Sequence, residues 1–171
     1  MEDIEVPTEH LHETIHEHVK ESGESGWFKY VAISTAFMAV FAAISGLMAG
    51  HYSNEALIEQ IKASDQWAYY QAKGIKSEIK ALQMKEEKVD QQAAINKYKE
   101  EQAAIKEKAE EAEKSSGFHL AKHVLLAEAV TLFQVAIAIS AISILTRKKP
   151  LWLGSLVITA AGLFFFIWGF M

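Results

Sequence analysis

The sequence contains no cysteine and only two prolines, Pro7 and Pro150. Without cysteine, the chain forms no disulfide bond and offers no thiolate to a metal. It also lacks a glycine-rich phosphate loop and a Ser-His-Asp constellation on a plausible scaffold, so we expect no enzymatic activity. The formal net charge is −5 and no basic patch is larger than Arg147–Lys149, which argues against nucleic-acid binding.

Charge is missing from three long stretches of the chain. Residues 30–53 and 151–171 contain no Asp, Glu, Lys or Arg, and residues 124–146 contain only Glu128. Each stretch reaches the roughly 20 residues that an α-helix needs to cross about 30 Å of hydrocarbon. The sequence therefore predicts an all-α membrane protein with three transmembrane helices, at residues 27–51, 119–146 and 151–171.

The short connection between the last two apolar stretches predicts the orientation. Residues 147–150 form a basic loop that contains Arg147, Lys148 and Lys149. Lys and Arg in short loops favour the cytoplasmic side. We therefore expect a cytoplasmic N-terminus, with residues 52–118 and the C-terminus outside.

The charged segment between the first two apolar stretches is rich in helix-forming residues. From Asn54 to Lys114 it has no proline and one glycine, Gly74, and it is dense in Ala, Glu, Lys and Gln. Apolar or small residues recur three or four positions apart, a spacing typical of the seam of a coiled coil. A first run comprises Leu57, Ile61, Ser64, Ala68, Ala72, Ile75, Ile79 and Leu82, and a second comprises Ile95, Tyr98, Gln102, Ile105, Ala109 and Ala112.

Both ends of this segment return to the same membrane face, so a single unbroken helix is excluded. An antiparallel helical hairpin over residues 52–118 is the simplest solution. The seam loses its spacing between Leu82 and Ile95, and we place the turn within Lys85–Gln92.

A cluster of aromatic residues interrupts the charged segment. Trp67, Tyr69 and Tyr70 fall within four positions and cannot all face one seam. Either they pack against the other arm or a neighbouring protomer, or they form an exposed interaction surface, since Trp and Tyr combine a large contact area with a polar group.

Three stretches of the sequence together carry a resemblance. Gly50–Lys76, Ala129–Ser155 and Pro7–Glu13 resemble the bacterial membrane-protein family catalogued as domain of unknown function 4337. The stretch SDQWAYYQAKGIK, Ser64–Lys76, is the most recognisable motif of that family. The resemblance implies a small protein of the bacterial inner membrane with this layout, and it brings no established activity and no catalytic residues.

Glu128 is the one carboxylate inside an apolar stretch, and a carboxylate in lipid is costly enough to suggest a function. Thr131 and Gln134 follow it on the same helical face, which we expect to point at other helices. His51, His119, His123 and Glu128 are predicted near one membrane interface, where they would hold a transition metal or relay protons. Alternatively, Glu128 pairs with Lys122, His51 or His123 and only stabilises the bundle.

The first apolar stretch carries small residues, with Gly46 and Gly50 in a GxxxG spacing. Small residues let transmembrane helices approach closely, and the pattern favours a homo-oligomer.

The N-terminal segment, residues 1–26, is rich in His and Glu. Leu11, Ile15 and Val19 give it a narrow apolar stripe, which predicts a short amphipathic helix. His12 and His16 share one face with the spacing of an HExxH zinc motif, but the tract is too short to supply a third ligand. It is either a protomer-docking helix or part of a metal site to which several copies contribute.

These features favour a structural or interaction role, as a homo-oligomer that presents a coiled-coil hairpin to itself or to another envelope protein. The alternative is an oligomeric cation or proton channel lined by Glu128, Thr131 and Gln134. A third reading is a metal-binding membrane protein. No cofactor other than such a transition metal is expected.

Overall fold

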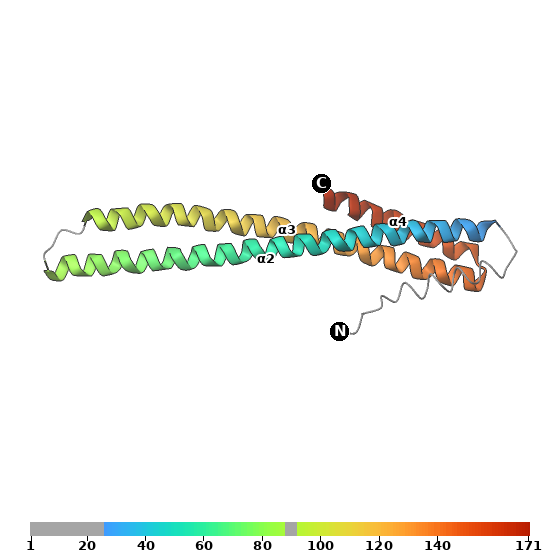
Figure 1. The fold of residues 1–171 in the computed structure, drawn as a ribbon, viewed down its shortest axis with the longest axis horizontal. Helices are drawn as coiled ribbons and strands as arrows, with labels where there is room; N and C mark the ends of the chain where they lie inside the picture. Colours follow the sequence, from blue (N-terminus) through green and yellow to red (C-terminus); the bar gives the residue numbers. More distant parts are fainter. Residues whose placement is uncertain (1–25, 88–91) are drawn as a thin grey trace. The chain divides into compact units, whose positions relative to one another are not determined.

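The computed structural model describes residues 26–87 and 92–171, which form three long α-helices (Figure 1). Helix α2 spans Trp27–Glu87, α3 spans Gln92–Thr146 and α4 spans Lys149–Phe170. The described residues contain no β-strand. The predicted all-α class is confirmed, and each of the three helices has a stretch long and apolar enough to cross a membrane.

Two predicted features involve residues outside the described ranges. The amphipathic N-terminal segment, with His12 and His16, lies there almost entirely. The turn predicted within Lys85–Gln92 falls where α2 ends at Glu87 and α3 begins at Gln92, and residues 88–91 between them are not described.

The basic loop joins α3 to α4 through a tight helix end without glycine. The amide of Lys148 donates to the carbonyl of Ser143, and the amide of Arg147 donates to that of Ile144. This is the Schellman arrangement, which satisfies the last carbonyls of a helix. Arg147 has the positive φ of 56° that the arrangement requires and that usually falls to glycine. Pro150 lies in the first turn of α4, where a backbone amide would have no hydrogen-bond partner within the helix, so the absence of an amide on proline costs nothing there.

The chain divides into two compact units, and each is described by itself. The apolar unit comprises residues 26–50 and 123–171 of the described chain, and the charged unit comprises residues 51–122, apart from residues 88–91.

The apolar unit contains two small clusters of buried residues. One consists of Phe28, Val31, Ala141 and Ile144, with Trp27 and Trp152 packed against it. The other consists of Met38, Ala136 and Ile137, with Ala39, Leu156 and Ile158 around it. Because α2, α3 and α4 each contribute residues, the clusters hold the three helices together within this unit.

Two glycines of α4 allow it to lie close to α3. A Cβ atom on Gly162 would lie 3.0 Å from Cε1 of Phe133, whose side chain is completely buried. A Cβ atom on Gly169 would lie 2.9 Å from Cγ of Leu126. Small residues at such crossings replace the hydrophobic effect as the source of helix association in lipid.

Hydroxyl groups buried between the helices also join the apolar unit. Ser140 and Ser155 form a hydrogen bond of 2.8 Å between α3 and α4. The indole nitrogen of Trp152 donates to Oγ of Ser34 on α2, at 3.2 Å. These groups are satisfied inside the protein, which avoids the cost of an unpaired polar group in an apolar medium.

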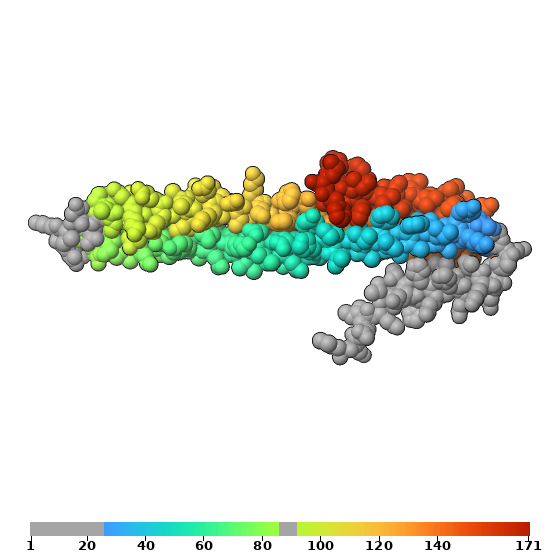
Figure 2. Space-filling model, turned by 45° about the horizontal axis from the view of Figure 1, so that its top comes forward, coloured from blue at the N-terminus to red at the C-terminus, as the bar shows by residue number. Residues whose placement is uncertain are grey.

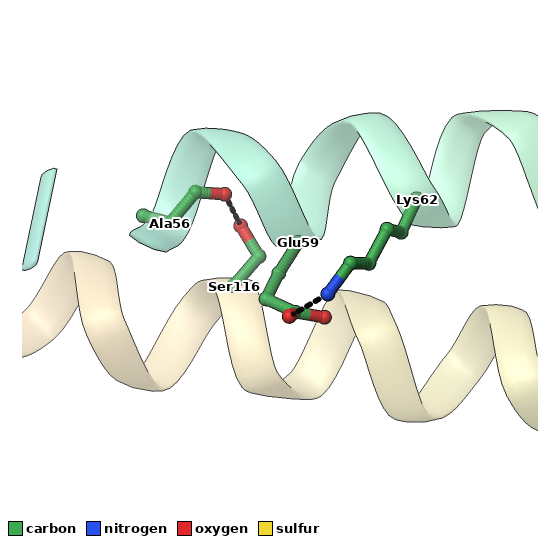
Figure 3. A network of polar contacts seen from close by, with 4 residues as sticks. All are labelled: Ala56, Glu59, Lys62 and Ser116. Atoms are coloured by element: carbon green, nitrogen blue, oxygen red, sulfur yellow. Dashed lines mark hydrogen bonds and ion pairs between the residues drawn. The ribbon is translucent and has the colours of Figure 1, made fainter. Parts of the chain in front are cut away.

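In the charged unit, α2 and α3 run antiparallel and lie side by side (Figures 1 and 2). The residues buried between them are small or aliphatic: Ala56, Ala63, Ser77, Ile95, Ile105, Ala109, Ala112 and Ser116. Oγ of Ser116 donates to the carbonyl of Ala56 at 2.9 Å, while Glu59 on the next turn of α2 pairs with Lys62 (Figure 3). Such small residues let the two backbones approach closely.

The two apolar runs of the charged segment do not meet. The second run faces α2, since Ile95, Ile105, Ala109 and Ala112 are buried. Every member of the first run is exposed, and Leu57, Ile61 and Ile75 expose about 60% of their surface. The expectation that both runs share one seam is wrong for the first run. The face of α2 that carries Ala56 and Ala63 packs on α3 instead, so the larger aliphatic side chains point away.

Candidate functional site

The aromatic cluster packs against α3. The indole nitrogen of Trp67 donates to Oε1 of Glu113 at 2.8 Å, and the Trp67 ring meets Tyr70 edge to face, with 5.6 Å between ring centroids. Tyr69 remains half exposed. The structure therefore places Trp67 and Tyr70 in contact with each other and Tyr69 beside Lys73, all within the charged unit, and their predicted role in binding a partner stays a prediction.

Lys73 adds a charged contact between the two helices. Its Nζ lies 2.5 Å from Oε2 of Glu101 and within 5.4 Å of the ring centroids of Tyr69 and Tyr98. The hydrogen bond from Lys73 lowers the pKa of Glu101, and the same bond, followed by that to Tyr69, raises the pKa of Lys73. The ion pair is therefore present over the whole neutral range.

A third contact joins the same stretch of α2 to α3. Nε2 of Gln102 donates to the carbonyl of Tyr70 at 3.2 Å. This amide lies over Gly74, where a Cβ atom would be 2.7 Å from Nε2. Gly74 therefore leaves the space that Gln102 occupies. We call the contacts Trp67–Glu113, Lys73–Glu101 and Gln102–Tyr70 the inter-helix lock.

The exposed first run forms a continuous surface on α2, which we call the outer stripe. It comprises Leu57, Ile61, Ser64, Ala68, Ala72, Ile75, Ile79 and Leu82. Its steps average close to the 3.6 residues of a helical turn, so the stripe runs straight along the helix. On α3, by contrast, no large hydrophobic residue of the described range 92–117 is exposed. Beside residues 92–117 of α3, the exposed aliphatic surface therefore belongs to α2, while Phe118 and Leu120 are exposed on α3 near the end of the charged unit.

The predicted polar face of α3 is exposed in the apolar unit. Glu128, Thr131 and Gln134 are all exposed, and Oγ1 of Thr131 donates to the carbonyl of Ala127 at 3.0 Å. Among the described residues, Glu128 has neither a hydrogen bond nor an ion pair, so its predicted pairing with His123 is not seen in the apolar unit, and the pairing with Lys122 or His51 stays a prediction. Whether this face lines a pathway stays a prediction.

The histidines of the predicted metal site make other contacts. In the charged unit, His51 and His119 each contact the ring of Tyr52, and Nδ1 of His119 is buried without a hydrogen-bond partner among the described residues. In the apolar unit, Nδ1 of His123 lies 2.9 Å from the carbonyl of Ala49. Across the described ranges, no group of three or more His, Cys, Asp or Glu side chains is arranged to hold a metal ion.

A groove lies beside Glu128 on the surface of the apolar unit. Its volume is about 490 Å³, and it is lined by His123, Val124, Ala127, Glu128, Thr131, Leu132 and Phe165. All of these residues except Phe165 belong to α3, and Phe165 belongs to α4. The groove therefore combines mainly apolar walls with one carboxylate.

The glycines of the GxxxG spacing are open within this chain. A Cβ atom on Gly50 would meet nothing within 4 Å, and one on Gly46 would make only an ordinary contact of 3.9 Å with Val130. The close helix approaches of the apolar unit fall instead at Gly162 and Gly169. The part of Gly46 and Gly50 in packing between copies stays a prediction.

Sequence reasoning did not find the groove or the buried serines. The buried hydroxyl residues Thr35, Ser45, Ser140 and Ser143 all lie within the apolar stretches, and recurrent hydroxyls in an apolar helix indicate helix contacts. The groove depends on how α4 packs beside α3, which no residue pattern specifies.

The fold and these surfaces define a class: an all-helical protein with three helices long and apolar enough to cross a membrane and with a charged unit of two packed helices. The chain belongs to the family described as Domain of unknown function (DUF4337), whose model matches residues 27–171. No curated protein and no solved structure shows significant similarity to this chain.

Proposed function

We propose that the protein has a structural role as a homo-oligomer of the bacterial inner membrane, in which the outer stripes of neighbouring copies pack together. The charged unit then acts as a coiled-coil hairpin that is presented outside the membrane, and the chain has no catalytic site. The observation that carries the proposal is the outer stripe, an aliphatic surface exposed on an otherwise charged helix.

The exposed aliphatic area of the outer stripe is large enough to stabilise a contact with a protein partner. Leu57, Ile61, Ile75 and Leu82 each expose about 60% of their surface and Ile79 about half. Full burial of a Leu or Ile side chain contributes about 1.5–3 kcal/mol, so covering the exposed part of each contributes about 1–2 kcal/mol. An aliphatic surface of this length in water is typical of an interaction site.

The spacing of the sequence favours a second copy as that partner. Seven residues before Leu57, small residues recur in steps of four and three at Gly50, Gly46 and Ala43, N-terminal to the outer stripe on the same helix. In lipid, small residues allow close helix approach, whereas in water large aliphatic residues supply the hydrophobic effect. Copies in one membrane share one orientation, so α2 of each copy offers the same pattern in parallel.

The inter-helix lock supports the hairpin part of the proposal. It ties the face of α2 beside the stripe to α3 through an ion pair and two hydrogen bonds. The stripe is thereby held on a two-helix body and need not be ordered when copies meet, which lowers the entropic cost of association.

Single cysteines test this proposal directly, because the natural chain has none. Ala68 lies in the middle of the outer stripe and Ala104 is exposed on α3. In a parallel α2 pair, the two Ala68 positions fall within the roughly 4.4–6.8 Å between Cα atoms that a disulfide requires. With an oxidant added to membranes, Ala68→Cys is expected to form a covalent dimer and Ala104→Cys is not.

Two results would overturn the proposal. One is monomeric protein in bilayers, measured by counting photobleaching steps of singly labelled copies. The other is equal crosslinking of the Ala68 and Ala104 variants, which would indicate random collision.

The Ala104 variant also tests the orientation, since a membrane-impermeant maleimide is expected to label it in intact spheroplasts.

A second candidate function is an oligomeric cation or proton channel lined by Glu128, Thr131 and Gln134. The observation that favours it is that all three side chains are exposed on one face of α3. Purified protein in liposomes with a pH-sensitive dye inside would then show a proton or cation flux that Glu128→Gln abolishes. Absence of flux from pH 5 to pH 8 removes this candidate and leaves the structural role untouched.

A further inference from the structure

The groove beside Glu128 offers hydrogen-bond acceptors in an apolar setting. Its walls are formed by Val124, Ala127, Leu132 and Phe165. Its volume of about 490 Å³ lies within the range of roughly 300–1,000 Å³ that is usual for small-molecule sites. Its polar groups belong to His123, Glu128 and Thr131.

Each of these polar groups is left as an acceptor by the contacts it already makes. Oγ1 of Thr131 donates its proton to the carbonyl of Ala127, so only its lone pairs remain. Nδ1 of His123 faces the carbonyl of Ala49, which only accepts, so Nδ1 carries a proton, and in the tautomer with this one proton Nε2 is an acceptor.

Glu128 completes the set with a carboxylate, which accepts from up to four directions. Among the described residues it has no donor partner, and the backbone amides of the surrounding helix are used within the helix. The groove therefore has negative charge and several acceptors but no donor. A ligand whose only charged group is an anion is therefore disfavoured.

A complementary ligand carries a positive charge, several N–H donors and an apolar body. A primary ammonium group fits, because it has three N–H donors on one charged atom. A trimethylammonium group has the same charge and no donor. Lipid surrounds every exposed surface of a membrane-spanning unit, so an ammonium-bearing lipid is at hand without having to enter from water.

We propose that this groove is a binding site for a membrane lipid whose headgroup ends in a primary ammonium, with the ammonium at Glu128 and Thr131 and an acyl chain along Leu132 and Phe165. The site explains how a carboxylate exposed on an apolar helix is accommodated. It does not depend on the proposed self-association, because all its residues come from one chain.

Native mass spectrometry of the full-length protein tests the site. The protein is released from nanodiscs that contain equal amounts of phosphatidylethanolamine and its mono-, di- and trimethylated forms with identical acyl chains. Retention is expected to fall stepwise with each methyl group, to about a tenth for the trimethylated lipid, the ratio that one hydrogen bond to a charged group supports. Equal retention of all four lipids would overturn the proposal.

Variants separate the site from general lipid contact. Glu128→Gln and Thr131→Val are each expected to weaken the preference, whereas Gln134→Ala, on the same face but outside the groove lining, preserves it. Circular dichroism shows which variants fold, and Thr131→Val keeps the shape of the side chain if Glu128→Gln does not fold. A preference that survives both Glu128→Gln and Thr131→Val rejects the site.

A final arm distinguishes a lipid from a free amine. Hexadecylamine shares the ammonium and one chain but lacks the glycerol backbone and the second acyl chain that hold the lipid in the bilayer beside the groove, and it is expected to displace phosphatidylethanolamine only at a large excess. Displacement at equal concentration would mean that a free amine, and not the lipid, is the preferred ligand, and would overturn the assignment to lipid.

Discussion

The close approach of α4 to α3 at Gly162 predicts the effect of adding a single methyl group. In Gly162→Ala the new Cβ lies 3.0, 3.2 and 3.3 Å from three ring atoms of Phe133. Carbon atoms prefer a separation of about 3.5–4.0 Å, so ring or helix must move by roughly half an ångström. The ring is completely buried, and it stacks on Phe41 with 5.9 Å between centroids, so a shift of the ring disturbs other packed side chains.

The magnitude follows from two opposing terms. Replacing Gly by Ala inside a helix favours the helix by about 1 kcal/mol. Overpacking a filled interior costs about 1–3 kcal/mol. Gly154, on the same helix, has nothing within 4 Å of its Cβ position, so Gly154→Ala gains the first term alone. The Gly162 variant should therefore be less stable than the Gly154 variant by about 1–3 kcal/mol.

The assay is unfolding of full-length protein in mixed micelles, followed by circular dichroism as the fraction of denaturing detergent is raised. A double variant with Gly162→Ala and Phe133→Leu measures the coupling between the two positions. The smaller Leu side chain relieves the clash, so the stability changes of the two single variants should not add up in the double variant. Equal stability of the Gly154 and Gly162 variants, or strict additivity in the double variant, would refute the packing argument.

Three further predictions concern polar contacts. The hydrogen bond from Lys73 lowers the pKa of Glu101. The stability that the ionised Glu101 contributes is therefore complete above the ordinary pKa of 4.5 and is lost as the pH falls through the lowered pKa. Glu101→Gln should flatten the dependence of thermal stability on pH between pH 3 and pH 6, and an unchanged dependence contradicts the ion pair. Ser140→Ala removes one hydroxyl of the bond to Ser155 and should destabilise the apolar unit by about 0.6–1.7 kcal/mol in the same micelle titration; a neutral result would show that the bond contributes nothing. Trp67→Phe keeps the ring and removes the indole donor, so hydrogen exchange should quicken in the middle of the charged unit while the apolar unit keeps its protection.

The three long helices could be predicted from the sequence because their determinants are local. Uncharged stretches of membrane length, few prolines and a dense supply of Ala, Glu, Lys and Gln each act through neighbouring residues. The end of α3 at Thr146 was harder to predict in detail, since Arg147 takes the positive φ that glycine normally supplies. The basic charge of that loop was visible, but its conformation was not.

Side-chain placement depended on which face of α2 packs against α3, and periodicity alone does not decide that. Leu57 and Ile75 have the spacing of a buried seam, yet Ala56 and Ala63 are the residues buried. The inter-helix lock explains the choice: Lys73, whose partner Glu101 lies on α3, belongs to the face with Ala56 and Ala63, so pairing that charge fixes the rotation of the helix. Across 26–87 and 92–171 no group of three or more metal-ligating side chains is found, and His123 faces a backbone carbonyl, a partner that no sequence pattern reveals.

The inter-helix lock also constrains how the charged unit can change its length in evolution. Contacts such as Ser116 with Ala56 and Glu101 with Lys73 couple positions on two antiparallel helices, so an insertion in one arm alone puts every contact beyond it out of step. Only matched insertions, one in each arm, keep the contacts of the lock paired. Each insertion must also be close to a whole number of turns, because seven or eleven residues rotate a helix face by only about 20° and so leave the outer stripe continuous. Family members with longer or shorter charged units should therefore differ by paired insertions, and the reach of the unit should vary in steps of about 10 or 16 Å, at about 1.5 Å per residue.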